Sequence, residues 1–137
     1  MQHTLEWDYA PEYELLGVSA AVGSHRLAWS MNRAFGWALA CGEDLVVHPP
    51  KGQASVHPTM RFEPEAEGNK VTVVLNRVPE GVLARGAAGM DFLVVLHHHE
   101  LPAHEIIASL RALPEVSFVT ALDPESCGAL EPLMALD

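Results

Sequence analysis

The run from Phe92 to Leu96, FLVVL, is the longest stretch of this 137-residue chain in which every residue is aliphatic or aromatic. A strand that faces water on one side alternates apolar and polar residues, whereas a strand that is covered on both faces is apolar throughout. The segment DFLVVLH, residues 91–97, is therefore predicted to be a central strand. Each of its faces needs a cover.

A helix and a second strand are predicted directly after this strand. Pro102 suits the first turn of a helix and Pro114 ends it. The apolar stripe between them consists of Ile106, Ile107, Leu110 and Leu113. The segment VSFVTAL, residues 116–122, then predicts a strand. If the two strands are parallel, they form a right-handed βαβ unit with room for another strand between them.

The first half of the chain predicts a strand, a helix and a meander. YELLGVSA, residues 13–20, favours a strand, Ser24 is a candidate N-cap, and Gly36 is a candidate helix end. The meander consists of WALAC, DLVVH, ASVHPTMRF and KVTVVLNRV, which are residues 37–41, 44–48, 54–62 and 70–78. The segment 79–89 has three glycines and no clean period. We interpret it as a loop that lies over the sheet.

Together these elements predict an α+β fold in a single domain, residues 1–137. It has one mostly antiparallel sheet of about six strands with two helices on one face, in the order strand, helix, meander, strand, helix, strand. The other face of the apolar central strand would then need a cover. A homodimer would supply one.

The charge and the cysteines limit the partners and the compartment. The chain has 8 Lys and Arg against 18 Asp and Glu, a formal charge of −10, which disfavours nucleic acid and anionic membrane surfaces. The opening MQHTLEWDYAPEYE carries no targeting pattern, and no apolar run approaches the length of a membrane span, so a cytoplasmic protein is expected. Cys41 and Cys127 are interpreted as unpaired thiols in a reducing compartment, with Cys41 buried in its apolar strand.

The segment LHHHELPAH, residues 96–104, is the most conspicuous polar cluster, with four histidines and a glutamate. On a strand that leads into a helix, His97, His99 and His104 could converge with Glu100 as a fourth ligand, in the tetrahedral arrangement that suits zinc. The alternative interpretation is the polar end of a buried strand, with Glu100 favourably placed near a helix N-terminus.

Other polar groups were weighed as sites. His48 and His57 might face each other across a hairpin, or be two surface imidazoles flanked by prolines. The acidic run Glu63 to Glu67 is interpreted as a solvated hairpin tip. Asp91 is expected to hydrogen-bond loop backbone and to hold the segment 79–89. No nucleophile motif or phosphate-binding loop is present.

The stretch ELLGVSAAVGSHRLAWSMNRAFGWAL, with its strand followed by a helix, resembles the opening of the IPExxxVDY family of small bacterial proteins. The resemblance extends from about Glu14 to Asp123 and implies a fold and a cytoplasmic location without a reaction. Where the family motif falls, this chain has ARGAAGMDF, so only Asp91 matches it. The part from Asp91 to Leu122 is also similar to the second half of ACT-type regulatory domains, which bind small ligands at subunit interfaces.

Two functions follow as hypotheses. The first is a cytoplasmic, homodimeric binding domain that engages a protein or a small-molecule ligand without chemistry and without a cofactor. The second is a metal-binding protein or metal-dependent enzyme that uses His97, His99, His104 and Glu100 to hold zinc.

Overall fold

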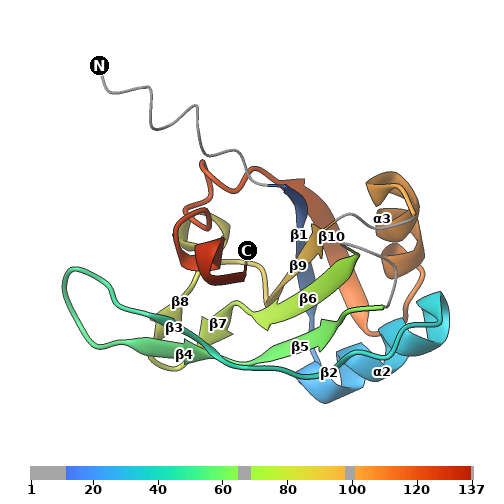
Figure 1. Ribbon diagram of the computed structural model, residues 1–137, viewed down its shortest axis with the longest axis horizontal. Helices are drawn as coiled ribbons and strands as arrows, with labels where there is room; N and C mark the ends of the chain where they lie inside the picture. The colour runs from blue at the N-terminus through green and yellow to red at the C-terminus, as the bar shows by residue number, and fades with distance from the viewer. Residues whose placement is uncertain (1–11, 65–68, 98–100, 137) are drawn as a thin grey trace.

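The computed structural model describes residues 12–64, 69–97 and 101–136, which form an α+β fold (Figure 1). In chain order the elements are β1 (Tyr13–Ala20), α2 (Ser24–Phe35), β2 (Ala40–Cys41), β3 (Leu45–Val47), β4 (Ser55–His57), β5 (Thr59–Phe62), β6 (Lys70–Leu75), β7 (Arg77–Val78), β8 (Gly81–Val82), η1 (Arg85–Ala87), β9 (Phe92–His97), α3 (Ala103–Arg111), β10 (Val116–Leu122) and η2 (Pro132–Leu136). The two η elements are 3₁₀ helices.

The main sheet has six strands in the order β10-β1-β9-β6-β5-β2, and every neighbouring pair is antiparallel. The apolar run lies in β9, inside the sheet, and all residues from Phe92 to His97 are buried. Val95 is opposite Leu15 of β1 on one side and opposite Thr72 of β6 on the other. The predicted central strand is therefore confirmed.

The strand–helix–strand unit is also confirmed. β9 and β10 are both antiparallel to β1, which lies between them, so they run parallel to each other. Helix α3 connects them. The expected gap for another strand is thus filled by the first strand of the chain, which makes β1 the link between the two halves of the fold.

Both helices pack on one face of the sheet (Figure 1). The core beneath them contains Leu27 and Met31 from α2, Ile106 and Leu110 from α3, and Val94 from β9, all almost fully buried. Burying each such side chain contributes about 1.5–3 kcal/mol to stability. Within the described residues, no helix has the length and apolar character that a membrane span requires.

The ends of α2 are set by two glycines. Gly23, in an extended conformation, is the N-cap, and no side chain caps the helix there. The expectation that Ser24 would be the N-cap is therefore wrong, because Ser24 is already helical. At the other end Gly36 adopts the left-handed conformation, φ 71°, and donates its N–H to the Asn32 carbonyl, as the sequence predicted.

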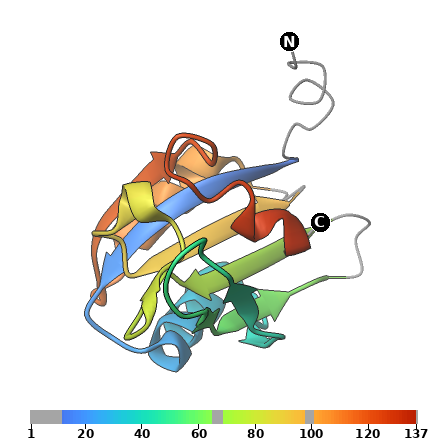
Figure 2. The ribbon, with the colours of Figure 1, turned by 90° about the vertical axis from the view of Figure 1, so that its left-hand side faces the viewer.

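The other face of the sheet is covered by the chain itself. Figure 2 shows the β3–β4 hairpin, the segment with β8 and η1, and the C-terminal segment with η2 in front of the sheet, with the helices behind. A second core lies here, formed around Leu93 and Val95 of β9 by Leu83, Ala87 and Leu133. The loop 79–89 therefore lies over the sheet as expected. The predicted need for a dimer to cover this face does not arise, because these irregular segments bury it.

The predicted four-strand meander is only partly correct. β5 and β6 pair, and the two-residue β2 adds to the edge of β5, but β3 and β4 form a separate two-stranded sheet. The run ASVHPTMRF is divided at Pro58, which has no N–H for a ladder. This break lets the hairpin leave the main sheet and fold over it.

Candidate functional site

His97 and His104 lie on different faces of the main sheet. His97 shares the face of Leu93 and Val95, and its ring is tilted against that of Tyr13, with centroids 5.3 Å apart. His104 is exposed in the first turn of α3, which packs on the opposite face. His99 and Glu100 lie outside the described residues, within which no group of three or more His, Cys, Asp and Glu side chains is placed to hold a metal. The zinc site stays a prediction.

His57 is fully buried, so neither interpretation of the two proline-flanked histidines is correct for it. It is opposite Leu45 in the hairpin, whereas His48 lies beyond the paired residues and is exposed. Its Nδ1 is 2.8 Å from the Leu75 carbonyl oxygen, and its Nε2 is 2.8 Å from Ser55 Oγ. Since a carbonyl only accepts, Nδ1 carries the proton, and in the neutral ring Nε2 accepts from the Ser55 hydroxyl.

The geometry of this serine–histidine pair indicates a structural role. Ser55 and His57 are 4% and 0% exposed, so no substrate reaches the hydroxyl without the hairpin opening. The two hydrogen bonds tie the covering hairpin to the end of β6. The pair resembles part of a catalytic triad only in residue type.

The loop 79–89 is held by Asn76, not by Asp91 as predicted. The buried Asn76 amide donates to the carbonyls of Ala87 and Met90 and accepts from the Ala84 N–H, at 2.8–2.9 Å. Asp91 instead accepts from the N–H of Ala20 at 2.9 Å and lies 3.5 Å from the Arg77 guanidinium. Its role is structural, as expected, but it stabilises the end of β1.

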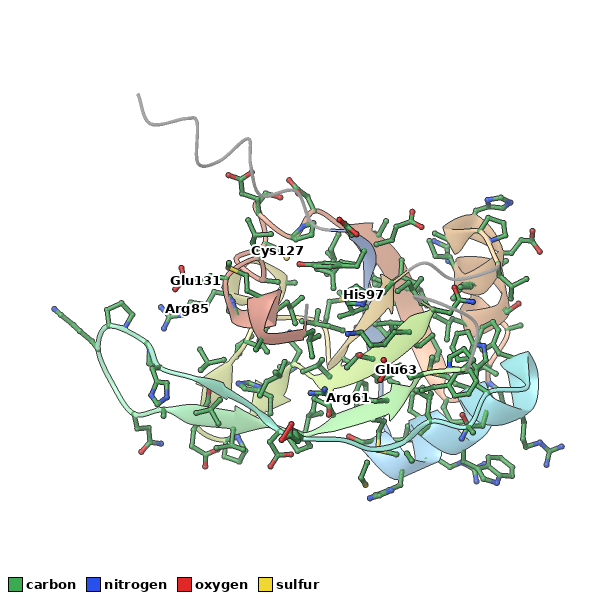
Figure 3. The ribbon with its side chains drawn as sticks, in the orientation of Figure 1. Arg61, Glu63, Arg85, His97, Cys127 and Glu131 are labelled. Atoms are coloured by element: carbon green, nitrogen blue, oxygen red, sulfur yellow. The ribbon has the colours of Figure 1, made fainter. Side chains whose placement is uncertain are left out.

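The two cysteines have opposite environments. Cys41 is exposed on the edge strand β2, so its predicted burial is wrong; the short edge strand does not enter the core. Cys127 is buried in the C-terminal segment, next to Gly86, whose N–H bonds to the Cys127 carbonyl, and burial raises the pKa of its thiol. Figure 3 shows Cys127 with Arg85 and Glu131 on the side of the sheet away from the helices.

The exposed face of α2 carries a cluster that we call the Trp29 cluster, consisting of Arg26, Trp29 and Arg33. Trp29 is 48% exposed, although it is among the largest apolar side chains of the protein. The guanidinium carbons of Arg26 and Arg33 lie 4.5 and 4.8 Å from its ring centroid. Residues three and four apart on a helix share a face, so the spacing of the three residues brings both cations to one ring.

Arg26 is fixed by a second interaction. Its guanidinium makes an ion pair with Glu115 at 3.1 Å, which joins α2 to the turn between α3 and β10. The Ser30 hydroxyl, the Glu115 backbone N–H and Arg26 all favour the carboxylate, and together they hold the pKa of Glu115 below its usual value. The Glu115 side chain is only 9% exposed. The ion pair with Glu115 therefore fixes the Arg26 side of the Trp29 cluster.

Arg33 has no such partner. Within residues 12–64, 69–97 and 101–136, Arg33 forms no ion pair and no hydrogen bond to a carboxylate. Beside it is an open groove of about 450 Å³ between α2 and the α3–β10 turn, with Leu113 and Pro114 on the far wall. Within the described part of the chain, a cation with no acidic partner and a half-exposed indole thus lie next to an apolar wall.

A second hollow, of about 360 Å³, lies at the C-terminal end of α2. Its walls include the stacked rings of Phe35 and Trp37, with centroids 4.3 Å apart, together with Phe62, Leu101 and Ile106. Among the described residues, Lys70 is the only charged one that lines it. The Lys70 ammonium donates to the Leu136 carbonyl. This hollow adds an apolar surface to the same helix.

Sequence reasoning missed the Trp29 cluster as a site, although the signal was present. Trp29 lies at the border of the apolar stripe of α2, and arginines occur three residues before it and four after it. Tryptophan and arginine are not among the nucleophiles, general bases and metal ligands by which a catalytic or metal site is usually found in a sequence. Asn76 was missed because it ends an apolar run that predicted a continuous strand.

Comparison with known proteins yields no relative. No family model matches the chain, no curated protein is similar to it, and no solved structure matches it. The resemblances to the IPExxxVDY family and to ACT-type domains therefore stay predictions.

Proposed function

We propose that this protein is a non-catalytic interaction domain that binds a partner protein through the Trp29 cluster and the adjacent groove. The observation that carries the proposal is the half-exposed Trp29 ring, which contacts two guanidinium groups beside an open groove. Tryptophan and arginine dominate the energetics of protein interfaces, because they bury a large area with little loss of conformational entropy or bind carboxylates in a fixed geometry.

The groove favours a particular kind of segment. Arg33 offers a cation on one wall, with no acidic partner among the described residues, and Leu113 and Pro114 offer an apolar surface on the other. A partner segment that carries a carboxylate next to a large apolar side chain satisfies both walls. Arg26 and Arg33 are the cations that line the groove, so a segment with one or two carboxylates suits this surface best.

The compartment and the assembly are part of the same proposal. Both cysteines are free in the structure, which supports a reducing compartment such as the cytoplasm. A homodimer remains our proposal for the assembly, but its support no longer comes from an uncovered sheet face. The dimer contact we propose is formed by an exposed surface such as the Trp29 cluster.

The test is binding of a fluorescein-labelled peptide in which glutamate, phenylalanine and aspartate are flanked by glycines, followed by fluorescence anisotropy. We expect the wild-type chain to bind it, and the matched peptide with glutamine and asparagine to bind at least about tenfold more weakly, a loss of about 1.4 kcal/mol. Trp29→Ala and Arg33→Gln should each weaken binding of the acidic peptide by a similar factor. Phe118→Ala is the control, since Phe118 is 50% exposed on β10, outside the groove.

Two results would contradict the proposal. One is no binding of the acidic peptide by the wild-type chain. The other is binding that Phe118→Ala weakens as much as Trp29→Ala does, because the peptide would then be held by exposed aromatic surface in general.

A further inference from the structure

The chain itself contains a segment of the kind that the groove favours. Residues 5–9 are Leu-Glu-Trp-Asp-Tyr, with two carboxylates on either side of an indole. In an extended chain, alternate side chains point to opposite sides and repeat about every 7 Å. If the segment docks in extended form, Glu6 and Asp8 point to one side of it and Trp7 to the other.

This alternation matches the two walls of the groove. The guanidinium carbons of Arg26 and Arg33 lie on one ring, within about 9 Å of each other, on the α2 wall. Leu113 and Pro114 form the opposite wall. A segment lying along the groove can direct its two carboxylates to the arginines and its indole to the apolar wall.

We propose that the partner of the Trp29 cluster is a second copy of this chain, which docks its residues 5–9 in the groove. This inference rests on the proposed function, since it names the partner of the same site. The charges are complementary: Glu6 and Asp8 meet Arg33 and the free edge of Arg26. The contact is made twice in a symmetric pair, once in each direction.

The length of the segment permits exchange between two copies. The described chain begins at Glu12, next to the start of β1, and six residues of extended chain reach about 20 Å from there to Glu6. The two copies can therefore contact each other without their sheets meeting. This arrangement leaves both covered faces of each sheet intact, as the fold requires.

The test is a charge exchange between two full-length variants. The variant Glu6→Lys/Asp8→Lys leaves the groove unchanged and reverses the charge of the segment. The variant Arg33→Glu leaves the segment unchanged and reverses the charge of Arg33 in the groove. Sedimentation velocity at physiological ionic strength measures association over a range of protein concentrations. We expect the wild-type chain to dimerise, and each variant alone to associate at least about tenfold more weakly.

Mixing the two variants is the decisive step. In the mixture one contact pairs the native acidic segment with the native groove, and the other pairs the lysine segment with the glutamate of the altered groove. Dimers should return, which also shows that both variants are folded. The control Glu80→Lys/Glu125→Lys makes the same change in net charge at exposed positions and should dimerise like the wild type.

Three results would overturn the inference: a monomeric wild-type chain at every concentration, a dimer that both variants retain, or two monomeric variants that stay monomeric when mixed. None of these removes the proposed function. Binding of the acidic peptide to the Glu6→Lys/Asp8→Lys variant, whose groove is unchanged, tests that function separately.

Discussion

The two faces of the main sheet are covered in different ways. On one face, α2 and α3 contribute a regular cover whose backbone groups are satisfied within each helix, so that only apolar side chains such as Leu27 and Ile106 need to meet the sheet. On the other face, the cover consists of a hairpin, a loop and a C-terminal segment. Outside the short β3–β4 and β7–β8 ladders, their backbone groups have no regular partners and must find them elsewhere.

Buried polar side chains supply those partners. Asn76 bonds to three backbone groups of the loop, and His57 links the hairpin to β6. The helical face uses polar residues differently, at its surface, where Arg26 and Glu115 hold the Trp29 cluster. An irregular cover therefore depends on single polar residues in the core, whereas a helical cover leaves polar residues available for binding.

Substitution of Asn76 should have the largest effect on stability. Asn76→Ala leaves the Ala87 and Met90 carbonyls and the Ala84 N–H buried without their partner, at about 1–3 kcal/mol each. We expect a loss of roughly 3–6 kcal/mol in the free energy of unfolding, measured by urea denaturation. Asn76→Asp should also destabilise strongly, because a carboxylate cannot donate to the two carbonyls. A loss below about 1 kcal/mol would show that the loop does not depend on this residue.

His57→Leu should come next. The substitution introduces an apolar side chain of similar size and leaves the Leu75 carbonyl and the Ser55 hydroxyl without their partner. The expected loss is about 2–4 kcal/mol in urea denaturation. The control is His48→Leu at the exposed histidine of the same hairpin, which should change stability by no more than about 0.5 kcal/mol. Equal losses in both variants would contradict the structural role of the buried ring.

Thr72→Val should stabilise the protein. Thr72 is fully buried in β6, and among the described residues its hydroxyl has no hydrogen-bond partner. Replacing the hydroxyl by a methyl group of similar shape removes a buried polar atom, with an expected gain of about 1 kcal/mol. A destabilised variant would reveal a partner for this hydroxyl and would bring Thr72 into the same class as Asn76 and His57.

The smallest effect is expected on the helical face. The pKa of Glu115 is lowered in the folded protein, so its contribution to stability is complete above the usual carboxyl pKa of about 4.3 and is lost as the pH falls through the lower folded value. Glu115→Gln should therefore be less stable than wild type at pH 7, and the difference should vanish in acid. Thermal unfolding at several pH values measures it, with the exposed Glu80→Gln as the control. A stability difference that persists at low pH would show that Glu115 acts through side-chain packing and not through its charge.

The elements with strong periodicity were predicted well from the sequence. β1 and β10 have the predicted bounds, and α2, α3 and β9 lie where the apolar patterns placed them. The segments from Trp37 to Val78 were predicted less well. Pro58 and Asn76 each end a strand that the apolar pattern alone would continue. Cys41 was expected inside the core because its run is apolar, but the two-residue edge strand β2 leaves it exposed.

For the site, the sequence contained the residues but not their arrangement. The arginine spacing around Trp29 predicts a shared helix face, yet only the fold shows that Glu115, far along the chain, pairs with Arg26, while Arg33 has no acidic partner among the described residues. Likewise, the alternation of LHHHELPAH suggested convergence, but His97 and His104 are directed to different faces because α3 crosses to the side opposite His97.

The sequence by itself determined the central strand, both helices and the two-layer α+β class, because local periodicity decides which face of an element is apolar. Only the tertiary structure decided what covers the second face of the sheet and which polar residues became buried to hold that cover. Those outcomes depend on contacts between segments distant in the chain, whose backbone groups needed partners that no local pattern specifies.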